Sequence, residues 1–79
     1  MKTTRFTPTA INDLRAYGGQ GKRILARIEA YAANGAGDVR DLVGRPGKRL
    51  RVGDFRVIFE ENDTEITVTR VGPRGKVYD

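Results

Sequence analysis

The stretch KRLRVGDFRVIFEENDTEITVTRV, which runs from Lys48 to Val71, decides the fold. Apolar and polar residues alternate along much of it, and it is rich in the β-branched and aromatic residues that strands favour. Gly53-Asp54 leaves only two residues between the first two runs, in the order that a type II′ hairpin turn favours. We therefore predict three strands, at residues 48–52, 55–61 and 65–71, of which the first two form a tight hairpin.

This turn fixes which residues of the hairpin lie opposite each other. With Gly53-Asp54 as the loop, Arg51 pairs with Arg56, and Arg49 pairs with Ile58. Because side chains alternate between the two faces of a sheet, one face becomes apolar and the other basic. The core face is expected to hold Leu50, Val52, Phe55, Val57 and Phe59, joined by Ile66 and Val68, while Thr67 and Thr69 lie beside the arginines.

The positive charge of the chain is concentrated on this hairpin and the segment before it. The net charge is +5, and the segment from Arg40 to Phe59 alone has six basic and two acidic residues, a balance of +4. Arginines that face each other across a sheet repel, and their planar forks fit phosphate groups. The pattern favours a nucleic-acid-binding surface. An acidic protein partner and a merely solvated, aggregation-resistant face are the alternatives.

The first half of the chain predicts a strand and two helices. Residues 2–6 alternate weakly, as in a strand, and Thr7 is a good N-cap for a helix that begins at Pro8 and ends at Tyr17. Apolar residues at helical spacing predict a second helix over QGKRILARIEAYAAN, residues 20–34. Residues 35–47 are expected to form a loop from which Val39, Leu42 and Val43 dip toward the core, and residues 72–79 a loop that leaves the sheet. The elements together predict one α+β domain, residues 1–79, in which the N-terminal strand and a two-helix hairpin accompany a small antiparallel sheet.

Composition excludes several kinds of site. The chain has no cysteine and no histidine, so disulfides, thiolate metal sites and nucleophile–histidine–acid triads are excluded. The carboxylates lack metal-ligand spacing, and we expect neither a metal nor another cofactor. There is no apolar run of about 18 residues and no signal-peptide pattern, so we expect a cytoplasmic protein without a membrane contact.

The order of strand, two helices and antiparallel sheet, together with the hairpin RLRVGDFRVIF and the later VGPRGKVY, resembles the RelE/ParE superfamily of type II toxin–antitoxin toxins. The resemblance covers nearly the whole chain. It implies that the helix pair packs on one face of the sheet, and that the chain is a toxin neutralised by a cognate antitoxin. RelE-like members cut mRNA on the ribosome, whereas ParE-like members poison DNA gyrase. We favour the RelE-like branch, with a gyrase inhibitor and a degenerate toxin that only binds its antitoxin as alternatives.

The resemblance also implies site residues and partners. The partners would be the antitoxin, the ribosome and mRNA, and a toxin–antitoxin hetero-oligomer would bind operator DNA through the antitoxin. Positions that are lysines in RelE-type enzymes are arginines here, and arginine does not accept protons near neutral pH. The proton acceptor for attack by a 2′-OH is therefore left open between Tyr78, Lys48 and Lys76, and Tyr78 has the alternative role of packing on the sheet. The expected catalytic residues are Arg51, Arg56, Arg74 and Tyr78, and the expected RNA-binding residues are Lys48, Arg49 and Lys76.

Overall fold

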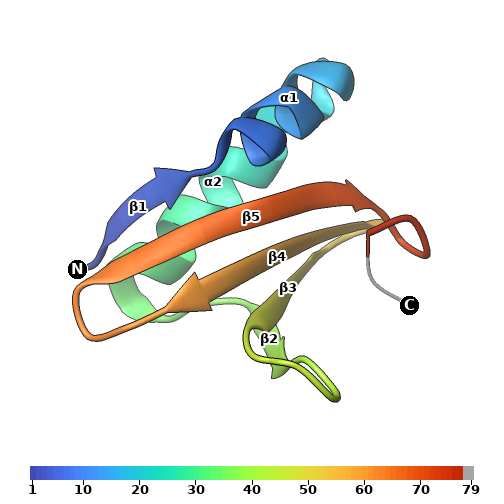
Figure 1. Ribbon diagram of the computed structural model, residues 1–79. Helices are drawn as coiled ribbons and strands as arrows, with labels where there is room; N and C mark the ends of the chain where they lie inside the picture. Colours follow the sequence, from blue (N-terminus) through green and yellow to red (C-terminus); the bar gives the residue numbers. More distant parts are fainter. Residues whose placement is uncertain (78–79) are drawn as a thin grey trace.

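The computed structural model describes residues 1–77 of the chain. Two helices accompany a five-stranded sheet with the strand order β1-β5-β4-β3-β2 (Figure 1). The predicted α+β fold is confirmed, although the sheet is mixed because β1 runs parallel to β5. The elements are β1 (Thr3–Phe6), α1 (Pro8–Ala16), α2 (Gln20–Asn34), β2 (Asp38–Asp41), β3 (Lys48–Val52), β4 (Phe55–Glu61) and β5 (Glu65–Pro73).

The hairpin of β3 and β4 has the predicted register. Arg51 lies opposite Arg56, and Arg49 lies opposite Ile58. Gly53 has a φ of +57°, and no residue other than glycine has a positive φ in the described chain, so only the first turn position is left-handed, as a type II′ turn requires. The predicted core face is buried against Ile24 and Ile28 of α2, with Phe55 partly buried at its margin.

Helix α1 follows β1 and lies beside β5, at the edge of the sheet beyond the point where β1 ends. Thr7 caps the helix through its hydroxyl, which accepts from the backbone N–H of Ala10 at 3.2 Å, and the N–H of Thr7 donates to the carbonyl of Val68 at 3.0 Å. Further along α1, Oδ2 of Asp13 accepts from the N–H of Val71 at 2.9 Å. The Asp13 carboxylate thus accepts a backbone hydrogen bond from β5 that a carbonyl of a neighbouring strand would otherwise accept. No helix within residues 1–77 is long and apolar enough to cross a membrane.

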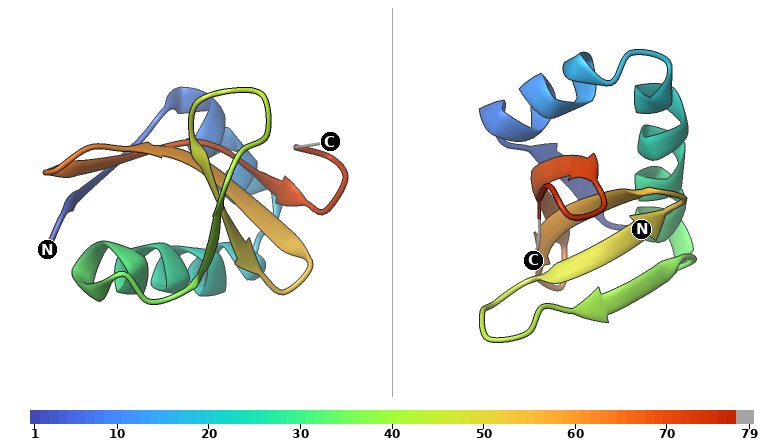
Figure 2. Two further views of the ribbon diagram at one scale, coloured as in Figure 1. Left: turned by 90° about the horizontal axis from the view of Figure 1, so that it is seen from below. Right: turned by 90° about the vertical axis from the view of Figure 1, so that its right-hand side faces the viewer.

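The prediction of a loop at residues 35–47 is wrong over its middle part. Residues Asp38–Asp41 form β2, an edge strand that pairs with β3 and places Asp38 opposite Arg51. Val39 is partly buried and Leu42 is buried, as expected, but Val43 is 84% exposed. The remaining loop, residues 42–47, rises from the side of the sheet away from α2 (Figure 2).

The last strand differs from the prediction at a β-bulge. The register between β4 and β5 shifts between Ile58 and Phe59, so that one extra residue of β5, Thr69, fits between their partners. The bulge changes the phase of the strand. Ile66, Val68 and Val71 are all buried, and Arg70 rather than Thr69 lies beside Ile58. Strand β5 also continues through Gly72 and Pro73, which were expected to leave the sheet.

Candidate functional site

The face of the sheet opposite α2 carries most of the basic side chains of the strands. The register places Arg40 beside Arg49, Asp38 beside Arg51, and Gly72 beside Arg56. We call this surface the arginine face and define it by the arginines that the strands present on it. They are Arg40 of β2, Arg49 and Arg51 of β3, Arg56 of β4 and Arg70 of β5.

Arg56 lies on this face beside the hairpin turn and is held in place. Only 8% of the residue is exposed. Its Nη1 donates to the carbonyls of Gly53 at 3.0 Å and Phe55 at 2.9 Å, so the hairpin turn fixes the guanidinium. Burial, followed by the charges of Arg51, Arg49 and Arg74, lowers the pKa of Arg56. The guanidinium remains a cation near neutral pH, and the charges of three further arginines act on it, partly offset by that of Asp54.

Arg51, the cross-strand neighbour of Arg56, has a carboxylate partner that the sequence did not reveal. Its Nη1 lies 3.6 Å from Oδ2 of Asp38 on β2, and about half of each side chain is exposed. Asp38 therefore offsets part of the repulsion between the paired arginines, without any polyanion. The sequence GDVRD did contain one indication of this edge strand, because its charged residues Asp38 and Arg40 alternate with an apolar residue.

The segment after β5 curls back toward the hairpin turn. The N–H of Arg74 donates to the carbonyl of Asp54 at 2.7 Å, and the N–H of Lys76 donates to the carbonyl of Pro73 at 3.0 Å. The side chain of Val77 covers Gly72, where an added β carbon would lie only 2.5 Å from its Cγ1. Arg74 is thereby brought to the end of the sheet that carries Arg56. Tyr78, an expected catalytic residue, lies outside the described residues.

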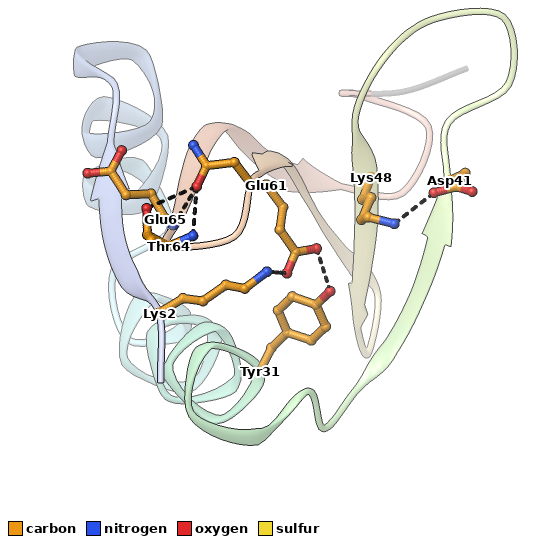
Figure 3. Close-up of polar contacts among 8 residues, drawn as sticks. Lys2, Tyr31, Asp41, Lys48, Glu61, Thr64 and Glu65 are labelled. Atoms are coloured by element: carbon orange, nitrogen blue, oxygen red, sulfur yellow. Dashed lines mark hydrogen bonds and ion pairs between the residues drawn. The ribbon is translucent and has the colours of Figure 1, made fainter.

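Of the two expected RNA-binding lysines, Lys48 lies apart from these arginines, whereas Lys76 follows Arg74 in the turn after β5. Lys48 has the same strand parity as Leu50, so it stands on the side of β3 that faces α2. Its Nζ lies 2.9 Å from Oδ1 of Asp41 on β2 (Figure 3), and this hydrogen bond and charge raise the pKa of Lys48. Lys48 is therefore a poor proton acceptor at neutral pH. Lys76 is exposed in the turn that follows β5.

A second polar cluster, at the far end of the molecule, was not predicted. Glu61 accepts a hydrogen bond from the Tyr31 hydroxyl at 2.8 Å and pairs with Lys2 at 2.7 Å (Figure 3). Burial, followed by the bond to Glu61, raises the pKa of Tyr31 to about 12. Burial acts to raise the pKa of Glu61 as well, but the hydrogen bonds from Lys2 and Tyr31 outweigh it and lower that pKa. This cluster ties Lys2, just before β1, to α2 and to the end of β4.

The chemistry available near the hairpin turn is that of guanidiniums. Within residues 1–77, no group of three or more acidic, histidine or cysteine side chains is placed to hold a metal. The positive charges of Arg51 and Arg74 act on Arg56, and guanidiniums as a class have N–H donors that match the oxygens of a phosphate. Fixed cations of this kind stabilise charge that develops on phosphoryl oxygens.

Comparisons with known proteins agree with this geometry. The family model described as the ParE toxin of the type II toxin–antitoxin system parDE matches residues 4–78. A chain of the RelB-RelE antitoxin–toxin complex from Methanococcus jannaschii is 29% identical, with 87% of this chain and 88% of that chain covered and a TM-score of 0.71. The archaeal RelE-RelB complex from Pyrococcus horikoshii gives 23% identity, coverage of 96% and 98%, and a TM-score of 0.77.

A third similar structure is the E. coli DinJ-YafQ toxin–antitoxin complex, at 10% identity, coverage of 99% and 98%, and a TM-score of 0.79. The Pyrococcus and E. coli structures, both below 25% identity, show that the fold is shared and no more. No functionally curated protein matches the chain. The match of the family model over residues 4–78, on a RelE-like fold, shows that this chain belongs to the ParE toxin family and is a toxin of a type II toxin–antitoxin system.

Proposed function

We propose that this toxin is a ribosome-dependent endonuclease that cleaves mRNA. The observation that supports the proposal is the cluster of guanidiniums at the hairpin turn, where Arg56 is fixed by two backbone carbonyls and Arg51 and Arg74 lie near it. A gyrase inhibitor that acts by protein contact alone has no need of a buried arginine within a cationic face. Buried cations are costly to keep unless their position serves a purpose.

In the proposed reaction, the 2′-OH of one nucleotide attacks the adjacent phosphate. A bond forms between the 2′-oxygen and phosphorus, the bond from phosphorus to the 5′-oxygen breaks, and the proton lost by the hydroxyl is balanced by one gained at the leaving oxygen. The products are a 2′,3′-cyclic phosphate and a 5′-OH end. Arg51, Arg56 and Arg74 would stabilise the pentavalent phosphate. Tyr78 or Lys76 would move a proton, and the ribosome would supply the alignment that a site without histidine needs.

The partners follow from the same proposal. The structural relatives from M. jannaschii and P. horikoshii are toxin–antitoxin complexes, and a small acidic antitoxin would complement the net charge of +5 on this chain. We propose that such an antitoxin holds the toxin inactive, and that the hetero-oligomer binds operator DNA through the antitoxin. The free toxin would then act in the cytoplasm, where translating ribosomes are.

Inhibition of DNA gyrase is the second candidate, because the family model that matches the chain is that of ParE. Single-turnover mRNA cleavage on programmed ribosomes, run beside a gyrase supercoiling assay, separates the two. If the toxin is a nuclease, Arg51→Ala should slow cleavage by roughly 100-fold or more, the usual effect of removing a transition-state donor. Arg40→Ala is the matched control, since Arg40 occupies the same face at the edge strand and also lies near Asp38, at 3.8 Å.

The two candidates give opposite results in this pair of assays. The nuclease proposal requires cleavage by the wild type and by Arg40→Ala, a large loss in Arg51→Ala, and no effect on supercoiling. If the wild type inhibits supercoiling and leaves ribosome-bound mRNA intact, the nuclease proposal is wrong and the gyrase candidate takes its place. If Tyr78→Phe cleaves at the wild-type rate, Tyr78 does not transfer a proton. Lys76 or the ribosome would then have to do so.

A further inference from the structure

A hollow of about 340 Å³ lies on the arginine face, at the end away from the hairpin turn. The loop at residues 42–47 forms one of its walls. Its apolar lining comes from Leu42 and Pro46 of this loop and from Ile58 of β4. Ile58 shares the face of the arginines but is only 5% exposed, and it lines the hollow together with the loop residues Leu42 and Pro46. The basic surface therefore contains one apolar recess.

The polar lining of the hollow differs in kind from the cluster around Arg56. Arg45, Glu60 and Arg70 contribute to it, so that both signs of charge are present. Arg70 is held in position, because its Nε donates to Oδ2 of Asp13 on α1 at 3.0 Å. Around Arg56, in contrast, the neighbouring charges are mostly positive. An anion is favoured at Arg56, whereas a ring with both donors and acceptors is favoured in the hollow.

We propose that the hollow binds one nucleobase of a single-stranded RNA whose backbone phosphate lies on the arginines near the hairpin turn. This inference rests on the nuclease proposal and extends it to substrate binding. A flat ring fits an apolar recess, and guanidinium planes stack on bases. The carboxylate of Glu60 accepts from base amino groups, while arginines donate to ring nitrogens and carbonyls.

The spacing on β4 suits such a nucleotide. Ile58 and Arg56 are two residues apart on the same face, which corresponds to about 7 Å along a strand. A phosphate at Arg56 and a base over Ile58 then belong to one nucleotide or to direct neighbours. The hollow would therefore bind a base close to the scissile phosphate and influence which sequences are cut.

Abasic scanning tests this assignment without any need for catalysis. The probes are 5′-labelled hexaribonucleotides that differ only in the position of one abasic residue, and fluorescence anisotropy at a fixed salt concentration gives their affinities for the full chain. Loss of a stacked base weakens binding by about fivefold or more. We expect one abasic position to show such a penalty with the wild type, and the penalty to shrink markedly in Arg70→Ala and in Glu60→Gln. Arg40→Ala removes a charge from the same face outside the hollow, and should keep the full penalty.

Each possible result decides a different point. Because Arg70→Ala also removes an ion pair with Asp13, Glu60→Gln supplies a variant of the same size and shape, and thermal unfolding checks both. A penalty that persists in both hollow variants would place the base elsewhere and overturn the inference. Salt-dependent binding with no sensitive position would overturn the base site and leave the nuclease proposal standing. No salt-dependent RNA binding by the wild type would overturn the base site, and the nuclease proposal would then be decided by the cleavage assay on programmed ribosomes.

Discussion

Replacement of Gly72 by alanine should displace the turn that follows β5 without altering any arginine. A β carbon on Gly72 would lie 2.5 Å from Cγ1 of Val77 and 3.5 Å from the hydroxyl of Tyr17. Non-bonded carbons prefer about 3.5 to 4.0 Å, so Val77 has to retreat by roughly 1 Å or more. Valine turns about one stiff torsion, so the turn that carries Arg74 should move with Val77.

The expected consequence is a loss of activity with little loss of stability. A displacement of about 1 Å at an active site can cost on the order of 100-fold in rate. Gly72→Ala should therefore slow single-turnover mRNA cleavage by about that factor. Gly72 does not have a left-handed φ, so alanine brings no backbone strain, and the free energy of unfolding should fall by no more than about 1 kcal/mol.

The double variant Gly72→Ala/Val77→Ala tests the cause directly. Val77→Ala removes Cγ1 and leaves a β carbon at 3.7 Å from the new methyl group, which is an ordinary contact. The double variant should cleave at the rate of Val77→Ala alone. Full activity in Gly72→Ala would show that Val77 turns aside without moving Arg74. A double variant as slow as Gly72→Ala would show that the clash with Val77 is not the reason.

Two further predictions concern charge. Arg51→Ala and Arg56→Ala should each flatten the log–log salt dependence of RNA binding by about 0.7 to 1 unit, because each removes one phosphate contact; unchanged slopes in both would mean a merely solvated face. Tyr31→Phe should cost about 1 kcal/mol in the free energy of unfolding, because it deletes the hydroxyl that donates to Glu61. The pKa of Tyr31 rises from 10.0 to about 12 on folding, so its contribution is complete below pH 10 and is lost as the pH rises toward 12. Urea unfolding across this range should show a decline in the wild type that is smaller in Tyr31→Phe, and equal declines would contradict the assignment.

The hairpin and its faces could be predicted because local chemistry determines them. A two-residue turn at Gly53-Asp54 leaves one register, and the alternation of side chains then places Arg51 opposite Arg56. The same alternation places Lys48 with Leu50 on the side of α2, so its separation from the arginines was also available from the sequence. The strong helix signals, Thr7-Pro8 at one start and the apolar stripe of α2, were equally local.

The features that escaped prediction depend on partners elsewhere in the chain. Strand β2 has only four residues, of which Val39 alone is apolar, and β3 supplies its hydrogen bonds. The bulge at Thr69 follows from the fit of β5 to β4, and nothing in the local sequence of Thr69 and Arg70 distinguishes it. The ion pair of Asp38 with Arg51 can be predicted only when β2 is known. The ion pair of Asp13 with Arg70 can be predicted only when the bulge is known.

The parallel pairing of β1 with β5 affects how the chain can fold during its own synthesis. Arg5 and its ion-pair partner Glu65 are 60 residues apart, and β5 is the only strand within residues 1–77 that β1 joins. The N-terminal strand therefore waits, unfolded or loosely collapsed, until almost the whole sheet has been made, and contacts of such long range form late. Arg74 emerges later still. A nascent chain thus has no assembled arginine cluster, and any activity that depends on this cluster begins only after Arg74 has left the ribosome.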